Sequence, residues 1–177
     1  MQTRLIEDGR TSAGAVFSQD RKYRYRLWRI WDESKPVCAF IMLNPSTADE
    51  FVLDPTVRKC VAYAKKWGYG ALEVGNIFAL KSTSPALLYS EPDPVGPLND
   101  ANLMDISHSA SLVVAAWGVH GEYRNRGAQV RTMIPDMHCL SLTKGGQPGH
   151  PLYLKGDVEP FSLKPIIRVE YTQQEVQ

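Results

Sequence analysis

Short apolar runs recur along the chain, and each is followed by polar residues or glycine. They cover residues 37–43, 71–78, 111–117 and 138–142. A run that is apolar at nearly every position is typical of a strand buried on both faces of a parallel sheet. Between the runs, the pattern indicates helices over about residues 55–67, 99–108 and 124–134. Strands alternating with helices predict an α/β fold, namely a three-layer α/β/α sandwich with a central, mainly parallel four-stranded sheet.

Residues 23–31 alternate in a different way and predict an N-terminal antiparallel strand or hairpin beside that sheet. The pattern places Tyr23, Tyr25 and Leu27 on one face and Arg24, Arg26 and Trp28 on the other. Charged side chains often protect an edge strand from pairing with other chains, and we favour that interpretation. The alternative is that Arg24 and Arg26 contact a nucleic-acid backbone while an aromatic ring stacks on a base.

Length and composition favour a single domain over residues 1–177, with a core over about residues 21–162. Of the 177 residues, 44% are hydrophobic, which suffices for one sizeable core. Lys and Arg total 20 and Asp and Glu total 19, so the net charge is only +1. This balance argues against a protein that holds nucleic acid by charge alone.

We expect a cytoplasmic protein with no membrane partner. The first residues lack the apolar core of a signal peptide, and no apolar stretch approaches the length of a membrane span. Cys38, Cys60 and Cys139 are far apart and form no Cys-x-x-Cys pair, so neither a zinc knuckle nor a disulfide framework is indicated. Cys38 and Cys139 lie in apolar runs and are expected to be buried. No metal or cofactor is expected.

Three polar residues stand where the predicted strands end: Asn44, Asn76 and His150. Ligand sites of parallel α/β sheets lie beyond the carboxyl ends of the strands, so the three are expected at one edge of the sheet. Each also has a simpler interpretation. Asn44-Pro45 can be only a turn, Asn76 can cap the next loop, and a lone histidine is more often a surface residue than a catalyst.

Acidic residues follow the first of these strand ends. Asp54 precedes Pro55, and an aspartate followed by proline is typical of a helix N-cap and its first helical position. Asp49 and Asp54 together offer an alternative, a general base or a cation site near the pocket. We favour the cap for Asp54, and no role is assigned to Arg58.

The motifs, taken in order, resemble those of the uracil-DNA-glycosylase superfamily. That superfamily has a strand and an Asn/Asp-Pro loop, a strand ending in Asn, a strand ending in Trp-Gly, and a His-Pro loop. The corresponding segments here are Met42-Leu43-Asn44-Pro45-Ser46, Val74-Gly75-Asn76, Val113-Val114-Ala115-Ala116-Trp117-Gly118 and His150-Pro151-Leu152-Tyr153-Leu154. Two positions depart from it: Met42 stands where many relatives carry Gly, and Leu152 replaces the Ser that usually follows His-Pro.

A second resemblance covers most of the chain. The segment 23–31 and the motifs around Asn44-Pro45-Ser46, Asp54-Pro55-Thr56, Asn76-Ile77-Phe78 and Gly149-His150-Pro151 look like those of a bacterial and phage family catalogued as domain of unknown function 1643. This family implies little chemistry, so the expectations about the site come from the glycosylase resemblance.

The glycosylase resemblance implies a role for several residues. Asn44 would position the attacking water and His150 would hydrogen-bond the departing base, as the two catalytic residues. Base binding would involve Asn76, Phe51, Pro45 and Ser46. Leu154 would act as a wedge in the DNA, and Lys144 and Lys155 would hold phosphates, with Arg24 and Arg26 as further DNA contacts.

The function implied is hydrolysis of the N-glycosidic bond of a damaged or modified base in DNA, single- or double-stranded, with that base flipped out. Two alternatives stay open. The same fold can be a non-catalytic module that binds a nucleobase or nucleic acid, or a hydrolase of free nucleotides or nucleosides. For the last of these, a near-neutral charge is no handicap.

Overall fold

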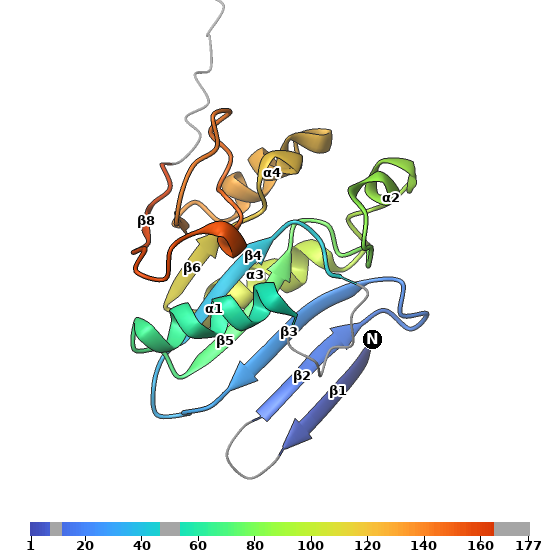
Figure 1. Cartoon of the computed structure of the whole chain (residues 1–177). Coiled ribbons are helices and arrows are strands. Elements are labelled where there is room, and N and C mark those ends of the chain that lie inside the picture. The colour runs from blue at the N-terminus through green and yellow to red at the C-terminus, as the bar shows by residue number, and fades with distance from the viewer. Residues whose placement is uncertain (8–11, 47–53, 165–177) are drawn as a thin grey trace, which may run out of the picture.

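The structure is a computed structural model that describes residues 1–7, 12–46 and 54–164, with only the backbone described for residues 4–7 and 85. It is a mixed α/β fold built on one eight-stranded sheet (Figure 1). The strands are β1 (Gln2–Glu7), β2 (Ser12–Phe17), β3 (Arg24–Ile30), β4 (Val37–Met42), β5 (Ala71–Asn76), β6 (Leu112–Ala115), β7 (His138–Cys139) and β8 (Phe161–Ser162). The α-helices are α1 (Pro55–Lys66), α2 (Pro85–Ser90), α3 (Asn99–Ser109) and α4 (Arg126–Met133), and two 3-10 helices are η1 (Val119–Asn125) and η2 (Pro151–Tyr153).

The strand order across the sheet is β1-β2-β3-β5-β4-β6-β7-β8. Strands β5, β4, β6 and β7 run parallel to one another, and every other neighbouring pair is antiparallel. The expected four-stranded sheet is therefore too small, because three N-terminal strands and β8 extend it. Strands β1 and β2 were not predicted. In β2, small residues such as Ala13, Gly14 and Ala15 have a low propensity for strands.

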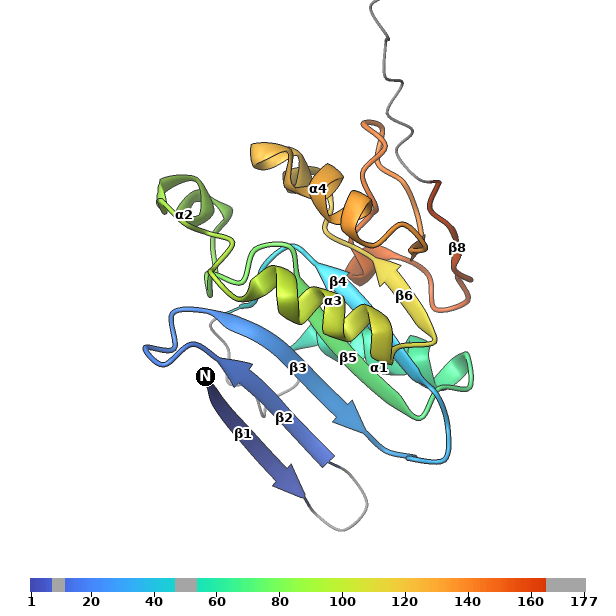
Figure 2. The same cartoon turned by 180° about the vertical axis from the view of Figure 1, so that it is seen from behind.

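Helices lie on both faces of the sheet (Figures 1 and 2). Helix α1 contributes Val57, Cys60 and Tyr63 to a core that also contains Phe40 and Val74 of the central strands. Helices α3 and α4 cover the opposite face, where Leu103, Ile106 and Val130 of these helices form a second core with Ala39 and Ile41 of β4. The three cysteines are all buried and free, as the apolar runs predict for Cys38 and Cys139.

The predicted alternation of β3 is wrong in part, because a bulge interrupts it. Val16 pairs with Arg26 but Phe17 pairs with Arg24, so one extra residue, Tyr25, is accommodated in β3. A bulge of this kind breaks the two-residue period of a strand. Tyr25 belongs to the core beneath α3, whereas Leu27 belongs to the core beneath α1.

The same bulge separates the two arginines of β3. Arg26 is hydrogen-bonded to Glu73 at 2.9 Å, and Glu73 also accepts a hydrogen bond from Ser109 of α3. Arg24 instead lies on the side of α1, beside Asp54 and Val57. The two side chains, predicted to share a face, therefore lie on opposite faces of the sheet.

The interpretation of residues 21–29 as an edge strand is also wrong. Strand β3 pairs with β2 on one side and with β5 on the other. The alternating arginines do not protect an exposed edge, since Arg24 is 5% exposed and Arg26 has an ion-pair partner. The hairpin of β1 and β2 takes the edge position instead.

Helix boundaries follow the local sequence signals where those are strong. Asp54 caps α1 by accepting a hydrogen bond from the Val57 amide at 2.8 Å, and Pro55 is the first helical residue, as predicted. Helix α4 begins later than predicted, because Arg124 and Asn125 have left-handed backbone angles of φ 51° and 55°. Among the described residues, no helix combines the length and apolar character that crossing a bilayer requires.

Gly70, just before β5, allows a test of the close packing in the connection between α1 and β5. A Cβ added there would lie 1.9 Å from the Asp32 carbonyl oxygen and 2.7 Å from Lys35 Cβ. The Gly70 carbonyl accepts hydrogen bonds from the Trp31 and Asp32 amides, so the backbone cannot move away cheaply. We expect Gly70→Ala to lower the free energy of unfolding by roughly 1–3 kcal/mol or more.

Urea unfolding monitored by circular dichroism measures this change. Gly156→Ala is the matched control, because no atom lies within 4 Å of the added Cβ. We expect that control to stay within about 0.5 kcal/mol of the wild-type protein. Equal stabilities for the two variants would contradict the close packing at Gly70.

Candidate functional site

A cavity of about 300 Å³ lies beside the carboxyl end of β4, on the face of the sheet covered by α1. Its lining combines the ends of two strands, the first turn of α1 and three loops: Arg24, Met42, Leu43, Asn44, Ser46, Asp54, Thr56, Val57, Ser82, Thr83 and His150. This is the location predicted from the strand ends. Asn44 and His150, which are more than 100 positions apart in the sequence, line the same cavity.

The side chain of Asn44 is held in one orientation. Its Nδ2 donates to the Ser82 carbonyl at 2.9 Å and to the Pro45 carbonyl at 3.2 Å. Since both partners are acceptors, the amide nitrogen must face them, and the amide oxygen faces away. Among the described residues, no group donates to that Oδ1, so it remains able to accept a hydrogen bond.

The loops that follow β4 and β5 are bonded to each other. The Ser82 amide donates to the Pro45 carbonyl at 2.9 Å, and the Phe78 amide donates to the Leu43 carbonyl at 2.9 Å. Pro45 is buried and supplies backbone acceptors to this junction. Together these bonds fix Asn44 and Ser82 relative to each other.

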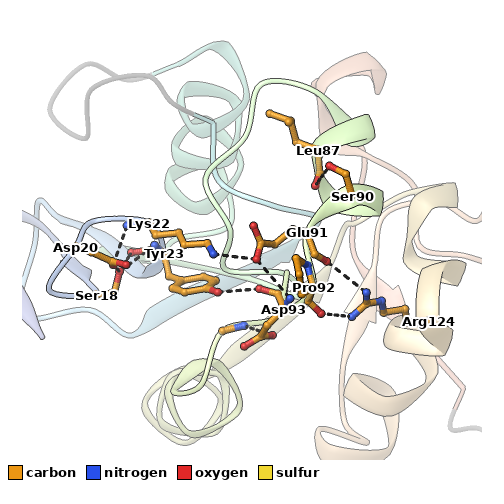
Figure 3. A network of polar contacts seen from close by, with 11 residues as sticks. Ser18, Asp20, Lys22, Tyr23, Leu87, Ser90, Glu91, Pro92, Asp93 and Arg124 are labelled. Carbon is orange, nitrogen blue, oxygen red and sulfur yellow. Dashed lines mark hydrogen bonds and ion pairs between the residues drawn. The ribbon is translucent and has the colours of Figure 1, made fainter.

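The segment after Thr83, which includes α2, is attached to the rest of the fold by the network shown in Figure 3. Lys22 forms an ion pair with Glu91 at 2.8 Å, and the Tyr23 hydroxyl donates to the Asp93 carbonyl at 2.8 Å. From the other side, the guanidinium of Arg124 donates to the Pro92 carbonyl at 2.8 Å. The segment that follows Ser82 and Thr83 is therefore anchored both to the residues just before β3 and to η1.

Asp54 has two functions in the local structure. One carboxylate oxygen caps α1, and the other accepts a hydrogen bond from Ser46 Oγ at 3.2 Å. The favoured interpretation of Asp54 as a helix cap is confirmed. The same residue also lines the cavity, so a negative charge lies at its border. Arg58 does not line the cavity, and Asp49 lies outside the described residues.

His150 has a defined tautomer. Its Nδ1 accepts a hydrogen bond from the Leu152 amide at 3.3 Å and thereby caps η2. A neutral imidazole that accepts at Nδ1 carries its proton on Nε2. Burial lowers the pKa of this ring, and the nearby Asp54 carboxylate opposes the shift only in part. At neutral pH, His150 is therefore a neutral donor through Nε2.

Helix α1 holds the loop that carries His150. The ammonium of Lys59 donates to the Leu152 carbonyl at 2.9 Å and also to the carbonyl of Leu154. The Tyr63 hydroxyl donates to the Lys155 carbonyl at 2.7 Å. These contacts attach the loop to the same helix whose first turn lines the cavity.

Asn76 is not among the cavity-lining residues. It is 2% exposed, and in the described part of the chain its Nδ2 has no hydrogen-bond partner. In the parallel register it lies next to Met42, and strand alternation puts its side chain on the face of Leu72 and Val74, which is the α1 side. The third residue of the predicted set therefore lies close to the cavity but deeper in the sheet.

The other residues predicted for binding lie in different environments. Leu154 is half-buried and packs against the core beneath α1, whereas the neighbouring Tyr153 is 87% exposed. Lys144 and Lys155 are exposed on the surface. Arg26 lies on the opposite face of the sheet, and Phe51 lies outside the described residues.

Trp117 and Phe78 do not line the cavity. Trp117 and Phe78 are both buried in the core on the other face of the sheet. Trp117 donates from Nε1 to Gln147 Oε1 at 2.9 Å, which satisfies its only donor. Over the described ranges, no group of three or more His, Cys, Asp or Glu side chains is placed to hold a metal ion.

Sequence reasoning did not select Ser82, Thr83 or Thr56 as cavity residues. Ser82 and Thr83 had a usable signal, because they lie in a Ser- and Thr-rich segment after the second apolar run. Lys59 had none, since its contacts with the loop around Leu152 depend on tertiary packing. The sequence analysis also did not predict that β3 contributes Arg24 to the lining of this cavity.

Comparison with known proteins identifies the chain at the level of a family. No curated protein and no solved structure was found to match. The family model described as "Protein of unknown function (DUF1643)" matches residues 24–152, a range that includes Arg24, Asn44, Asp54 and His150. The chain is therefore a member of the DUF1643 family of proteins of unknown function.

Proposed function

We propose that the protein is a glycosylase-like hydrolase that cleaves the N-glycosidic bond of a modified or damaged nucleotide in DNA. The observation that carries the proposal is that Asn44 and His150, from two distant loops, line one cavity of about 300 Å³. This volume is at the lower end of the range for small-molecule sites, about 300–1,000 Å³. The parallel strands β5-β4-β6-β7 with helices on both faces are compatible with a uracil-DNA-glycosylase-like architecture, which we include in the proposal.

In such a reaction, a water oxygen bonds to C1′ of the sugar while the bond from C1′ to the base nitrogen breaks. The sugar gains positive charge, the base leaves with the bonding electron pair, and the proton that the attacking water loses ends on the base anion. Asn44 can support the attack of the water. Its amide nitrogen is fixed by two carbonyls, so its Oδ1 can accept a hydrogen bond from the attacking water and hold it in position.

His150 can support the departure of the base. Its neutral ring donates from Nε2, and a donor at the edge of the departing base stabilises the negative charge that collects there. The Asp54 carboxylate borders the same cavity and favours the positive charge that develops on the sugar. Base recognition by Asn76 remains a prediction, because this residue is not in the lining of the cavity.

The proposal predicts that Asn44→Ala and His150→Ala each lower the rate of base release by roughly a hundredfold, the usual effect of losing one transition-state hydrogen bond. The substrates are single-stranded and duplex oligonucleotides that contain uracil, hypoxanthine, oxidised or phage-type modified bases. Abasic sites are measured by strand cleavage in alkali. His108→Ala is the matched control, because His108 is exposed at the far end of α3.

The outcomes also separate the alternatives. Absence of abasic sites on every oligonucleotide would overturn the proposal. If the protein bound these oligonucleotides tightly and in a salt-dependent way without cleaving them, a binding module would be favoured. Cleavage of free nucleosides without binding to DNA would favour an enzyme of nucleotide metabolism.

The lowered pKa of His150 predicts a pH-dependent contribution to stability. The unfolded chain binds this proton at the ordinary histidine pKa of about 6.5, whereas the folded chain binds it only at lower pH. The unfolded state therefore holds more protons at acid pH, and stability falls as the pH drops through the unfolded value until it reaches the folded one. Above that window, the contribution is constant.

Chemical unfolding of the wild-type protein and of His150→Gln between about pH 8 and about pH 5 tests this sign. The free energy of unfolding should fall less steeply towards acid pH in the variant. The other three histidines are common to both proteins and cancel in the difference. A steeper fall in the variant would contradict a buried, neutral His150.

A further inference from the structure

The guanidinium of Arg24 is one of the groups that line the cavity. We propose that Arg24 binds a phosphoryl group of the ligand inside this cavity, so that the substrate class is a nucleotide that enters with its phosphate. This inference rests on the proposed function for the nature of the sugar and base. The phosphate contact itself rests on the lining of the cavity.

The first argument is the burial of Arg24. Its side chain is 5% exposed and belongs to the cavity lining. Burying a guanidinium is costly unless charge and hydrogen bonds compensate for the lost water. Its five N–H donors in a planar fork can hold a partner in the protein and two phosphate oxygens at the same time.

The second argument is an unpartnered donor nearby. Asn76 Nδ2 is buried and has no hydrogen-bond partner among the residues that the structure describes. Asn76 lies next to Met42 in the register, on the same face of the sheet as Arg24. A buried polar group of this kind is rare and calls for a partner. Met42 lines the cavity, so a ligand acceptor that reaches past Met42 would satisfy the amide of Asn76.

The third argument concerns the carboxylate in the cavity. Asp54 would repel an anion, but one of its oxygens accepts from the Val57 amide and the other from Ser46 Oγ. These two bonds bind the carboxylate to the first turn of α1 and to the loop after β4. Arg24 comes from β3, so the cavity receives its positive and negative charges from different elements.

The bulge in β3 makes this assignment specific. Regular alternation would give Arg24 and Arg26 the same face, and either could serve a phosphate. Because the register shifts at Tyr25, only Arg24 is directed to the cavity, while Arg26 pairs with Glu73 on the face of α3. Arg26 therefore provides a control with the same chemistry, two positions away.

The experiment uses a probe without a base, because the base is unknown. Binding of 2-deoxyribose 5-phosphate and of 2-deoxyribose to the full-length wild-type protein is measured by isothermal titration calorimetry. We expect the phosphorylated sugar to bind more tightly and Arg24→Met to weaken its binding by roughly tenfold to a hundredfold, the loss typical of a charged hydrogen bond. Arg26→Met should bind like the wild-type protein.

The phosphate can come from a free nucleotide or from a polynucleotide, and a second probe separates these sources. It is a single-stranded oligonucleotide with one tetrahydrofuran nucleotide in place of a complete one. Dependence on Arg24 for this probe alone identifies a polynucleotide, and dependence for the free sugar phosphate alone identifies a free nucleotide. Absence of any preference for the phosphorylated probes, or equal binding by Arg24→Met, would overturn the inference.

Two further measurements keep the test independent of folding and of the reaction. Arg24→Lys retains the charge but loses the planar fork, so it should bind the sugar phosphate with intermediate affinity. In the wild-type protein, the Arg24 Nε–H resonance should shift when 2-deoxyribose 5-phosphate is added and stay unchanged with 2-deoxyribose. All probes lack a base, so failure to release a base from DNA would count against the proposed reaction and leave the phosphate contact intact.

Discussion

Strand β4 is paired on both edges and packed on both faces, and the position of the cavity depends on that constraint. Strands β5 and β6 flank it in parallel. Along β4, Ala39 and Ile41 enter the core beneath α3, whereas Phe40 and Met42 enter the core beneath α1. A register shift of one residue would exchange these two sets, so the register is strongly specified. Because neighbouring strands run in the same direction, their following loops emerge together, and Asn44 meets Ser82 at one edge.

The parts of the fold that were predictable from sequence are those with strong local signals. The continuous apolar run of β4 predicts burial on both faces. Asp54-Pro55 predicts the start of a helix, because the aspartate can cap it and the proline suits its first position. The parallel order of the main strands follows from the alternation of runs and helices. The meeting of Asn44 and His150 follows in turn, since both stand beyond strand ends of a parallel sheet.

The parts that were not predictable depend on pairing between distant segments. The bulge at Tyr25 is set by how β3 meets β2, and nothing in residues 23–31 alone reveals it. Strand β2 is rich in small residues, so its partners and not its propensity make it a strand. Asn76 stands at the end of β5, as the motif predicts, but it is buried and does not line the cavity, which depends on how its neighbours pack.

Helix α1 touches the cavity twice, directly through its first turn and indirectly through the loop of His150. Asp54 and Val57 line the cavity, while Lys59 and Tyr63 hold carbonyls of that loop, more than 90 positions further along the chain. The two walls therefore belong to one mechanical unit. Because the loop is bonded to the helix, placing the helix also places the histidine, and folding orders one body here and not two separate loops. The loss of conformational entropy at this site is correspondingly smaller.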